Sequence, residues 1–222
     1  MNIPLSKRLH ACCGYVAPGE RVADIGCDHG YTGIYLLSQG IASSVIAADI
    51  NEMPLQSAIE NAQKFGVREK MEFYLSDGLK NVPRDFNTVI CAGMGADTIM
   101  SILDAAPWLQ QPNYRVILQC QSKIPALRKY LSDKGWFIHR ETVLRDGRFL
   151  YTVMEVFFCP QAPRLTVGQT YFPPALLIEP SPILQEYYED VLFRLRRAIN
   201  GRGENAEPEM VAALQELEVL KW

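Results

Sequence analysis

Residues Arg21 to Tyr31 read RVADIGCDHGY, which predicts a buried strand, a glycine turn and the start of a helix, in that order. The next apolar run, VIAAD, ends in the acidic residue Asp49. This arrangement is typical of a nucleoside-cofactor site in a doubly wound sheet, because glycine lets the backbone approach the ligand and the acid accepts hydrogen bonds from ribose hydroxyls. From this stretch alone, a tight strand-to-helix connection without a ligand remains the alternative.

The glycine spacing and one carboxylate indicate which cofactor suits this turn. A dinucleotide fingerprint needs G-x-G-x-x-G, whereas the glycines here are Gly26, Gly30 and Gly33, and Asp28 stands where a pyrophosphate would come closest to the backbone. A diphosphate would meet a negative charge there. S-adenosyl-L-methionine has a ribose and an adenine but no phosphate, and its sulfonium and ammonium groups are cationic, so an acidic turn suits it. The stretch therefore indicates a methyltransferase.

Length and composition favour a soluble protein with one main domain. The 222 residues are 48% hydrophobic, which is enough for one domain of about 160 residues and a small addition. No run of about eighteen apolar residues occurs, and the N-terminal segment carries charges where a signal peptide needs an apolar stretch. We therefore expect a cytoplasmic protein with no membrane partner. Six cysteines without a C-x-x-C pair are expected to be reduced core residues, and no metal site is expected.

Charge is spread unevenly along the chain. The net charge of −3 argues against a uniformly basic nucleic-acid binder. Between Arg115 and Arg148, however, eight basic residues stand against three acidic ones, a local surplus of +5 that suits contact with phosphate. An ordinary solvated face on a helix and a hairpin explains this surplus equally well.

Apolar strands alternate with amphipathic helices through most of the chain. Strands are predicted over residues 22–26, 44–50, 71–76, 88–92, 115–120, 136–144 and 149–158, and helices over 31–38, 52–65, 97–106 and 124–134. The alternation implies five parallel strands, and the turn RDGR at residues 145–148 adds an antiparallel hairpin. We predict an α/β protein with the class I, Rossmann-like fold of S-adenosylmethionine-dependent methyltransferases and a small C-terminal helical domain.

A change in composition marks the end of this fold. Residues 159–174 contain four prolines and little periodicity, which predicts a loop-like boundary. Beyond it, apolar residues recur at helical spacing, NGRG at residues 200–203 breaks the pattern, and the spacing then resumes. We predict a methyltransferase domain over residues 1–160 and a helical hairpin domain over residues 161–222.

Further candidates stand where predicted strands end, because ligands of open α/β sheets lie across the carboxyl ends of the strands. After the third strand, Asp77 offers a carboxylate to the adenine amino group and Gly78 lets the loop turn; an Asp-Gly turn without function is the alternative. After the fourth strand, AGMGAD at residues 92–97 predicts a flexible aperture for a flat substrate, with Met94 exposed. The alternative there is a plain turn with Asp97 or Thr98 as the helix N-cap.

The motifs, in their order, resemble one bacterial family. They are LSKRL at residues 5–9, ADIGCDHGY at 23–31, ADIN at 48–51, SDGL at 76–79, AGMG at 92–95, ILQ at 117–119 and LRKYLSDKGW at 127–136. Over residues 5 to 200 the chain resembles the TrmK family of tRNA (adenine-22-N1)-methyltransferases. The resemblance implies methyl transfer from S-adenosylmethionine to N1 of an adenine in the D-arm of tRNA, with a helical C-terminal domain helping to hold the RNA.

The chain departs from the family pattern at a few positions. Family members tend to have Ala in place of Gly30, Leu-Pro in place of Thr32 and Gly33, Gly in place of Ala96, and Pro in place of Cys120. The first two departures lie beside the expected cofactor, and the last two lie beside the expected substrate opening.

We expect particular residues to bind the cofactor and to act in catalysis. The predicted cofactor-binding residues are Asp24, Gly26, Cys27, Gly30, Tyr31, Asp49, Ile50, Asp77, Gly78 and Ala92. Adenine N1 has an in-plane lone pair and needs no deprotonation before it attacks, so alignment matters more than a strong base. The methylated ring is cationic until its amino group loses a proton, so we predict that Asp28 stabilises this charge and that His29 accepts the proton. Gly93 and Met94 are predicted beside the methyl group; a turn-capping Asp28 with a packed His29 is the alternative.

The predicted partner is tRNA, and we favour a monomer. Because N1 lies on the pairing edge, the base must leave its stack, and Tyr31 is the first candidate to stack on it. Candidate phosphate contacts are Lys7, Arg8, Lys123, Arg128, Lys129, Arg140, Arg145 and Arg148. A small-molecule methyltransferase is one alternative, although no long insertion at residues 82–97 provides a lid. Another RNA substrate is a second, and a non-catalytic binding module is a third, although Asp49 and Asp77 are both present.

Overall fold

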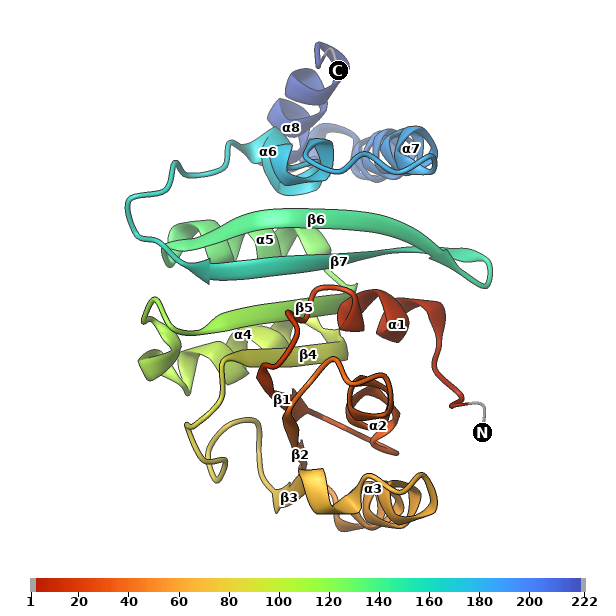
Figure 1. Cartoon of the computed structure of the whole chain (residues 1–222). Coiled ribbons are helices and arrows are strands. Elements are labelled where there is room, and N and C mark those ends of the chain that lie inside the picture. Colours follow the sequence, from red (N-terminus) through yellow and green to blue (C-terminus); the bar gives the residue numbers. More distant parts are fainter. Residues whose placement is uncertain (1–2, 221–222) are drawn as a thin grey trace.

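The computed structural model describes residues 3–220, apart from the side chain of Glu204. Within this range, one sheet has the strand order β3-β2-β1-β4-β5-β7-β6 (Figure 1). Its strands are β1 Arg21–Ile25, β2 Ser44–Asp49, β3 Met71–Leu75, β4 Thr88–Gly95, β5 Arg115–Ser122, β6 Trp136–Asp146 and β7 Phe149–Phe158. Strands β1 to β5 are parallel, and β7 pairs antiparallel with both β5 and β6. The predicted fold class is confirmed.

Helices cover both faces of the sheet, because neighbouring residues of a strand point to opposite faces (Figure 1). On one face, Val22 and Val45 share a core with residues of α1 (Lys7–Cys13), α2 (Tyr31–Ser38) and α3 (Glu52–Lys64). On the other face, Ala23 and Ile25 share a core with residues of α4 (Ala96–Asp104) and α5 (Ile124–Asp133). Burial on both faces explains why the parallel strands read as continuous apolar runs.

The C-terminal part adds helices on the β6 side of the sheet (Figure 1). They are α6 Val167–Tyr171, α7 Leu184–Arg202 and α8 Pro208–Glu218. The 3-10 helices η1 Arg68–Lys70, η2 Pro107–Leu109, η3 Pro174–Leu177 and η4 Gly203–Asn205 complete the described elements. Apolar side chains of α7 and α8 form a third core together with Val143 of β6. The domain division at residue 160 stays a prediction.

Three local features differ from the sequence-based expectation. Helix α1 was not predicted, and the proline-rich stretch contains α6, whose start is fixed by a capping box between Thr166 and Gln169. The predicted break at NGRG, in contrast, is confirmed: helix α7 passes through Gly201 but ends at Arg202, and Gly203 is its C-cap. Strand β4 runs on to Gly95 because Met94 pairs with Cys120 of β5, although the register shifts on either side of that pair.

Arg128 of α5 is buried and does not offer a phosphate contact, so that prediction is wrong. Its Nη2 donates to Oε1 of Glu141 (2.6 Å) and to the hydroxyl of Tyr187 (3.1 Å). Its Nη1 donates to the backbone carbonyls of Thr170 (3.1 Å) and Tyr171 (2.7 Å). An arginine in an amphipathic pattern is normally predicted to be exposed. Here the N–H groups of Arg128 instead donate to a buried carboxylate and to three further oxygens, which stabilise the buried charge. The guanidinium thereby ties α5 and β6 to α6 and α7.

No helix within residues 3–220 is both long and apolar enough to cross a membrane.

Candidate active site

A cleft of about 610 Å³ lies at the carboxyl ends of the parallel strands, where open α/β sheets bind their ligands. It is lined by Ile25, Gly26, Asp49, Ile50, Asn51, Ser76, Asp77, Gly78, Ala92, Gly93, Met94, Asp97, Thr98, Ser101 and Ile102. Eight of these are predicted cofactor or catalytic residues: Gly26, Asp49, Ile50, Asp77, Gly78, Ala92, Gly93 and Met94. The strand ends therefore bring together residues that are up to 68 positions apart in the chain, from Gly26 to Met94.

Asp49 fastens the glycine turn to the end of β2. Its Oδ2 accepts the backbone N–H of Asp28 (3.1 Å), and its Oδ1 accepts the backbone N–H of Asn51 (2.9 Å). The backbone N–H groups of Gly26 and Cys27 both donate to the carbonyl of Ala48. These bonds hold the turn in a conformation with positive φ at Gly26 (71°) and at Asp28 (48°). Positive φ is unusual for a residue with a side chain, so the surrounding hydrogen bonds hold Asp28 in this otherwise unfavourable conformation.

Asp24 lies beneath this turn and is 4% exposed. Burial raises its pKa from the ordinary 3.8 to about 7; a backbone N–H of Gly33 opposes the rise, and the charge of Asp49 adds to it. Its Oδ2 has no hydrogen-bond partner among the described residues. Asp24 is absent from the lining of the cleft.

The β4 side of the cleft is formed by Gly93 and Met94. Gly93 has a φ of 78°, and its backbone N–H donates to Oε1 of the buried Gln119 (3.1 Å). Met94 is only partly buried in the core, and its Cε lies directly against the position where a Cβ on Gly26 would stand. A side chain at position 26 would therefore collide with Met94. The stretch predicted to be a flexible small-residue loop is irregular strand backbone.

The charged side chains that line the cleft are all acidic. Asp49, Asp77 and Asp97 line it, and no Lys, Arg or His is among its lining residues. Asp77 and Asp97 are exposed and make ion pairs with Lys80 (2.5 Å) and Lys123 (2.7 Å) outside the lining. Such a cleft favours a cationic ligand and disfavours one that carries phosphate. Among the described residues, no group of His, Cys, Asp or Glu side chains has the arrangement of a metal site.

The remaining predicted residues near the turn lie outside the lining. Asp28 and His29 are exposed, and His29 Nε2 is 3.6 Å from Oδ1 of Asp28. Cys27 is buried, and burial raises the pKa of its thiol. Gly30 is buried with a φ of 73°, and Tyr31 packs edge-on against Phe65.

Sequence reasoning missed several residues of the lining. Ser76 stands directly before the predicted acid Asp77, and Asn51 stands two residues after Asp49. Ser101 and Ile102 follow Asp97 and Thr98 by one helical turn, so they share their face of α4. The helical period, applied from Asp97 onward, is the signal that would have found the last two.

Most predicted phosphate contacts already have carboxylate neighbours. Lys123 pairs with Asp97, Lys129 with Asp133, Arg145 with Glu186, and Arg140 with Glu155 and Glu179. Arg148 lies over the ring of Phe149, Lys7 is exposed, and Arg8 is 3.9 Å from Asp146. The local basic surplus is therefore largely balanced by acids from other parts of the chain.

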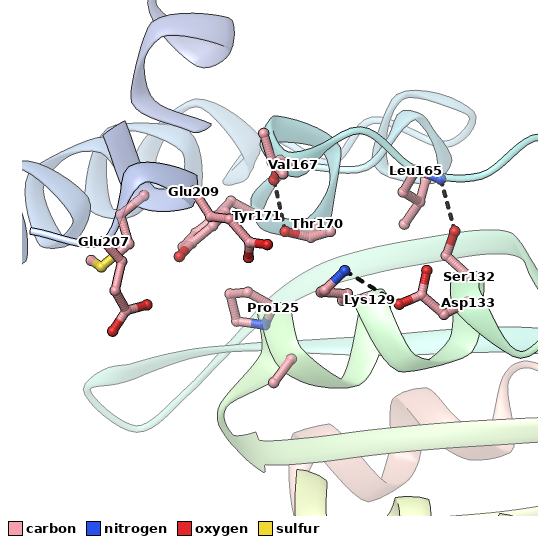
Figure 2. Close-up of a pocket in the computed structure, with 12 residues that line it drawn as sticks. Pro125, Lys129, Ser132, Asp133, Leu165, Val167, Thr170, Tyr171, Glu207 and Glu209 are labelled. Carbon is pink, nitrogen blue, oxygen red and sulfur yellow. Dashed lines mark hydrogen bonds and ion pairs between the residues drawn. The ribbon is translucent and has the colours of Figure 1, made fainter. Parts of the chain in front are cut away.

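A second cavity, of about 200 Å³, lies between α5 and the C-terminal helices (Figure 2). Glu207, Glu209 and Asp133 line it, together with Lys129, which pairs with Asp133. None of its lining residues lines the cleft at the strand ends. Its acidic wall does not suit a phosphate.

Fold and cleft together define a Rossmann-like methyltransferase domain. Residues 5–154 match a family model described as "Methyltransferase domain". The tRNA (adenine(22)-N(1))-methyltransferase of Bacillus subtilis is 30% identical over 154 residues, which cover 69% of this chain and 65% of the relative. The crystal structure of the B. subtilis m1A22 tRNA methyltransferase TrmK superposes with a TM-score of 0.80 at 25% identity, over 98% of this chain and 95% of that one.

A further solved structure supports the same relationship. It is a "putative tRNA (m1A22) methyltransferase" of Streptococcus pneumoniae in complex with S-adenosyl-L-methionine. Its TM-score is 0.82 at 29% identity, over 96% of this chain and 98% of that one. The chain belongs to the methyltransferase domain family and, within it, to the TrmK family.

Proposed function

We propose that this protein transfers a methyl group from S-adenosyl-L-methionine to N1 of adenine 22 in the D-arm of tRNA, as a monomer in the cytoplasm. The observation that carries the proposal is the cleft at the strand ends, which three carboxylates line without a basic residue. A dinucleotide cofactor would place its phosphates against these charges, whereas a sulfonium cofactor gains from them. The names of the B. subtilis and S. pneumoniae relatives supply the substrate and the position.

The residues present fit this cofactor. Each carboxylate oxygen of Asp49 accepts one backbone N–H, which leaves one lone pair on each oxygen for a ribose hydroxyl. Asp77 is exposed at the end of β3, where its carboxylate suits an adenine amino group. The unpartnered Oδ2 of Asp24 beneath the turn is the kind of uncompensated charge that a cationic ligand stabilises. When bound, the cofactor supplies an electrophilic methyl group on a cationic sulfur.

The chain's own residues then have to align the adenine and stabilise a developing positive charge. Gly93 and Met94 border the cleft on the β4 side, and we assign them the alignment of the base. Asp28 projects from the turn with 70% of its side chain exposed, and we assign it the stabilisation of the methylated ring. His29, 3.6 Å away, accepts the amino proton in this scheme. Tyr31 is proposed to stack on the base at the opening.

The proposed RNA surface follows the basic residues that remain solvent-accessible. We assign phosphate contacts to Lys7, Arg8, Lys123, Lys129, Arg140, Arg145 and Arg148. A basic residue that already pairs with a carboxylate exchanges one anionic partner for another when RNA binds. The net gain in binding free energy from each such contact is therefore modest.

Labelled S-adenosylmethionine and unmodified tRNA test the proposal. We expect label in 1-methyladenine, and no label when adenine 22 of the transcript is replaced by guanine. Label in another RNA or in a small molecule would mean that this molecule, and not tRNA, is the substrate. Cofactor binding without turnover would indicate a binding module. The variant Asp28→Asn should lower kcat about tenfold while cofactor affinity stays within about twofold, and the exposed control Glu60→Gln should change neither.

A further inference from the structure

Arg8, in the first turn of α1, holds a guanidinium that its neighbours do not satisfy. Its Nη1 is buried and has no hydrogen-bond partner among residues 3–220. Its nearest acid is Asp146 at the hairpin between β6 and β7, with 3.9 Å between Nε and Oδ2. That carboxylate also accepts the backbone N–H of Arg8 at 3.5 Å. The contacts anchor the start of α1 to the hairpin and leave Nη1 free.

The free Nη1 lies beside the β4 edge of the cleft. A Cβ built on Gly93 would lie 3.9 Å from Arg8 Nη1 and 3.6 Å from Nε2 of Gln121. Gly93 lines the cleft, on the side away from Asp49 and Asp77. A side chain at position 93 would therefore be in van der Waals contact with a cationic donor, at the edge of the place proposed for the target base.

A buried charged donor without an acceptor is costly, and proteins retain one where a ligand supplies the acceptor. We propose that Arg8 is a positioning residue for the target nucleotide, and that its Nη1 donates a hydrogen bond across Gly93 to an acceptor of that nucleotide. Two acceptors of an adenine nucleotide are the candidates, the ring nitrogen N7 and the phosphate. The inference rests on the proposed function, since it takes the target nucleotide to enter beside Gly93.

Steady-state methylation of a tRNA transcript at saturating S-adenosylmethionine tests the role of Arg8. We expect Arg8→Gln to lower kcat/KM for tRNA about 10- to 100-fold, the range of a lost charge-assisted hydrogen bond. Cofactor affinity, measured by calorimetry, and the melting temperature should stay close to wild type. Lys70→Gln is the matched control: the same charge is removed from an exposed residue just before β3, at the opposite edge of the sheet. It should leave kcat/KM unchanged.

Two further measurements identify the acceptor. If it is the phosphate, Arg8→Gln reduces the slope of log(kcat/KM) against log[salt] by about 0.7 to 0.9, and Arg8→Lys restores part of the activity. If it is N7, a transcript with 7-deazaadenine at the target slows the wild type to the level of Arg8→Gln and leaves the variant unchanged.

Several results would overturn the inference. Unchanged kcat/KM in Arg8→Gln would do so, and so would a loss fully explained by weaker cofactor binding, since the guanidinium would then serve the cofactor. A loss matched by a lower melting temperature, with no rescue in Arg8→Lys and no change in salt slope or 7-deaza response, would show a structural role. Wild-type protein that is inactive on tRNA would overturn the proposed function itself, whereas an active wild type with an equally active Arg8→Gln would overturn only this inference.

Discussion

Replacement of Asp24 by Asn should stabilise the free protein at alkaline pH and weaken its binding of S-adenosylmethionine. The carboxyl group is 4% exposed, and burial raises its pKa from 3.8 to about 7. Between those pH values the folded protein keeps the proton and the unfolded chain has released it. The unfolding free energy therefore falls as pH rises through this interval and stays lower above pH 7. The Asn side chain removes this dependence, because its amide does not ionise.

The magnitude follows from the two pKa values. Their separation corresponds to a loss of about 4 kcal/mol when Asp24 is fully ionised, which is an upper value because buried sites relax. Between pH 5 and pH 8, the wild type should lose about 2 to 3 kcal/mol relative to Asp24→Asn. The backbone N–H of Gly33 still has a carbonyl acceptor in the variant, so the turn keeps its contact.

Urea denaturation at pH 5, 6.5 and 8, followed by circular dichroism, measures this difference, with Glu60→Gln as a control for the loss of an exposed carboxylate. Calorimetry at pH 8 should show cofactor affinity at least about tenfold weaker in Asp24→Asn, since the ionised acid no longer offsets the ligand's positive charge. Stability curves of wild type and variant that run parallel from pH 5 to pH 8 would refute the reasoning, because they would mean that Asp24 does not titrate in this range.

Two further substitutions test the backbone of the turn and the buried ion pair. Gly30→Ala should lower the unfolding free energy by about 1 to 3 kcal/mol, because φ is 73° there and the new Cβ would lie 2.9 Å from Cβ of Ala58. Gly40→Ala is the control: φ is 66° but the space around it is open, so its unfolding free energy should fall by less. Equal decreases for both variants in urea titrations would contradict a role for the contact with Ala58. Arg128→Met should lose about 3 to 5 kcal/mol by leaving Glu141 buried and unpaired, and thermal unfolding close to wild type would argue against that.

The sequence was sufficient for the parts of the site that depend on local backbone chemistry. Asp49 could be placed because β1 and β2 are parallel neighbours, so the glycine turn after the first strand and the acid at the end of the next lie side by side. The hairpin between β6 and β7 was equally accessible, since Gly147 in the RDGR turn takes the positive φ that such a turn needs. In both cases the deciding contacts span few residues or follow from strand order.

Features that depend on tertiary packing escaped prediction. Nothing local distinguishes Arg128 from an exposed arginine, because its carboxylate and carbonyl partners come from later elements. Helix α1 has seven residues, too few for a clear apolar period, although Ser6 caps it. The capping box at Thr166 was readable, but neighbouring prolines favoured a loop. The position of Met94 over Gly26 likewise requires the fold.

Primer extension on a single tRNA tests the central claim most directly, because a methyl group on adenine N1 blocks the pairing edge. An unmodified transcript is incubated with the protein and S-adenosylmethionine and then copied by reverse transcriptase. The account predicts a stop immediately before adenine 22 that requires both the protein and the cofactor. Read-through at adenine 22 despite methyl incorporation, or a stop at another adenine, would contradict it.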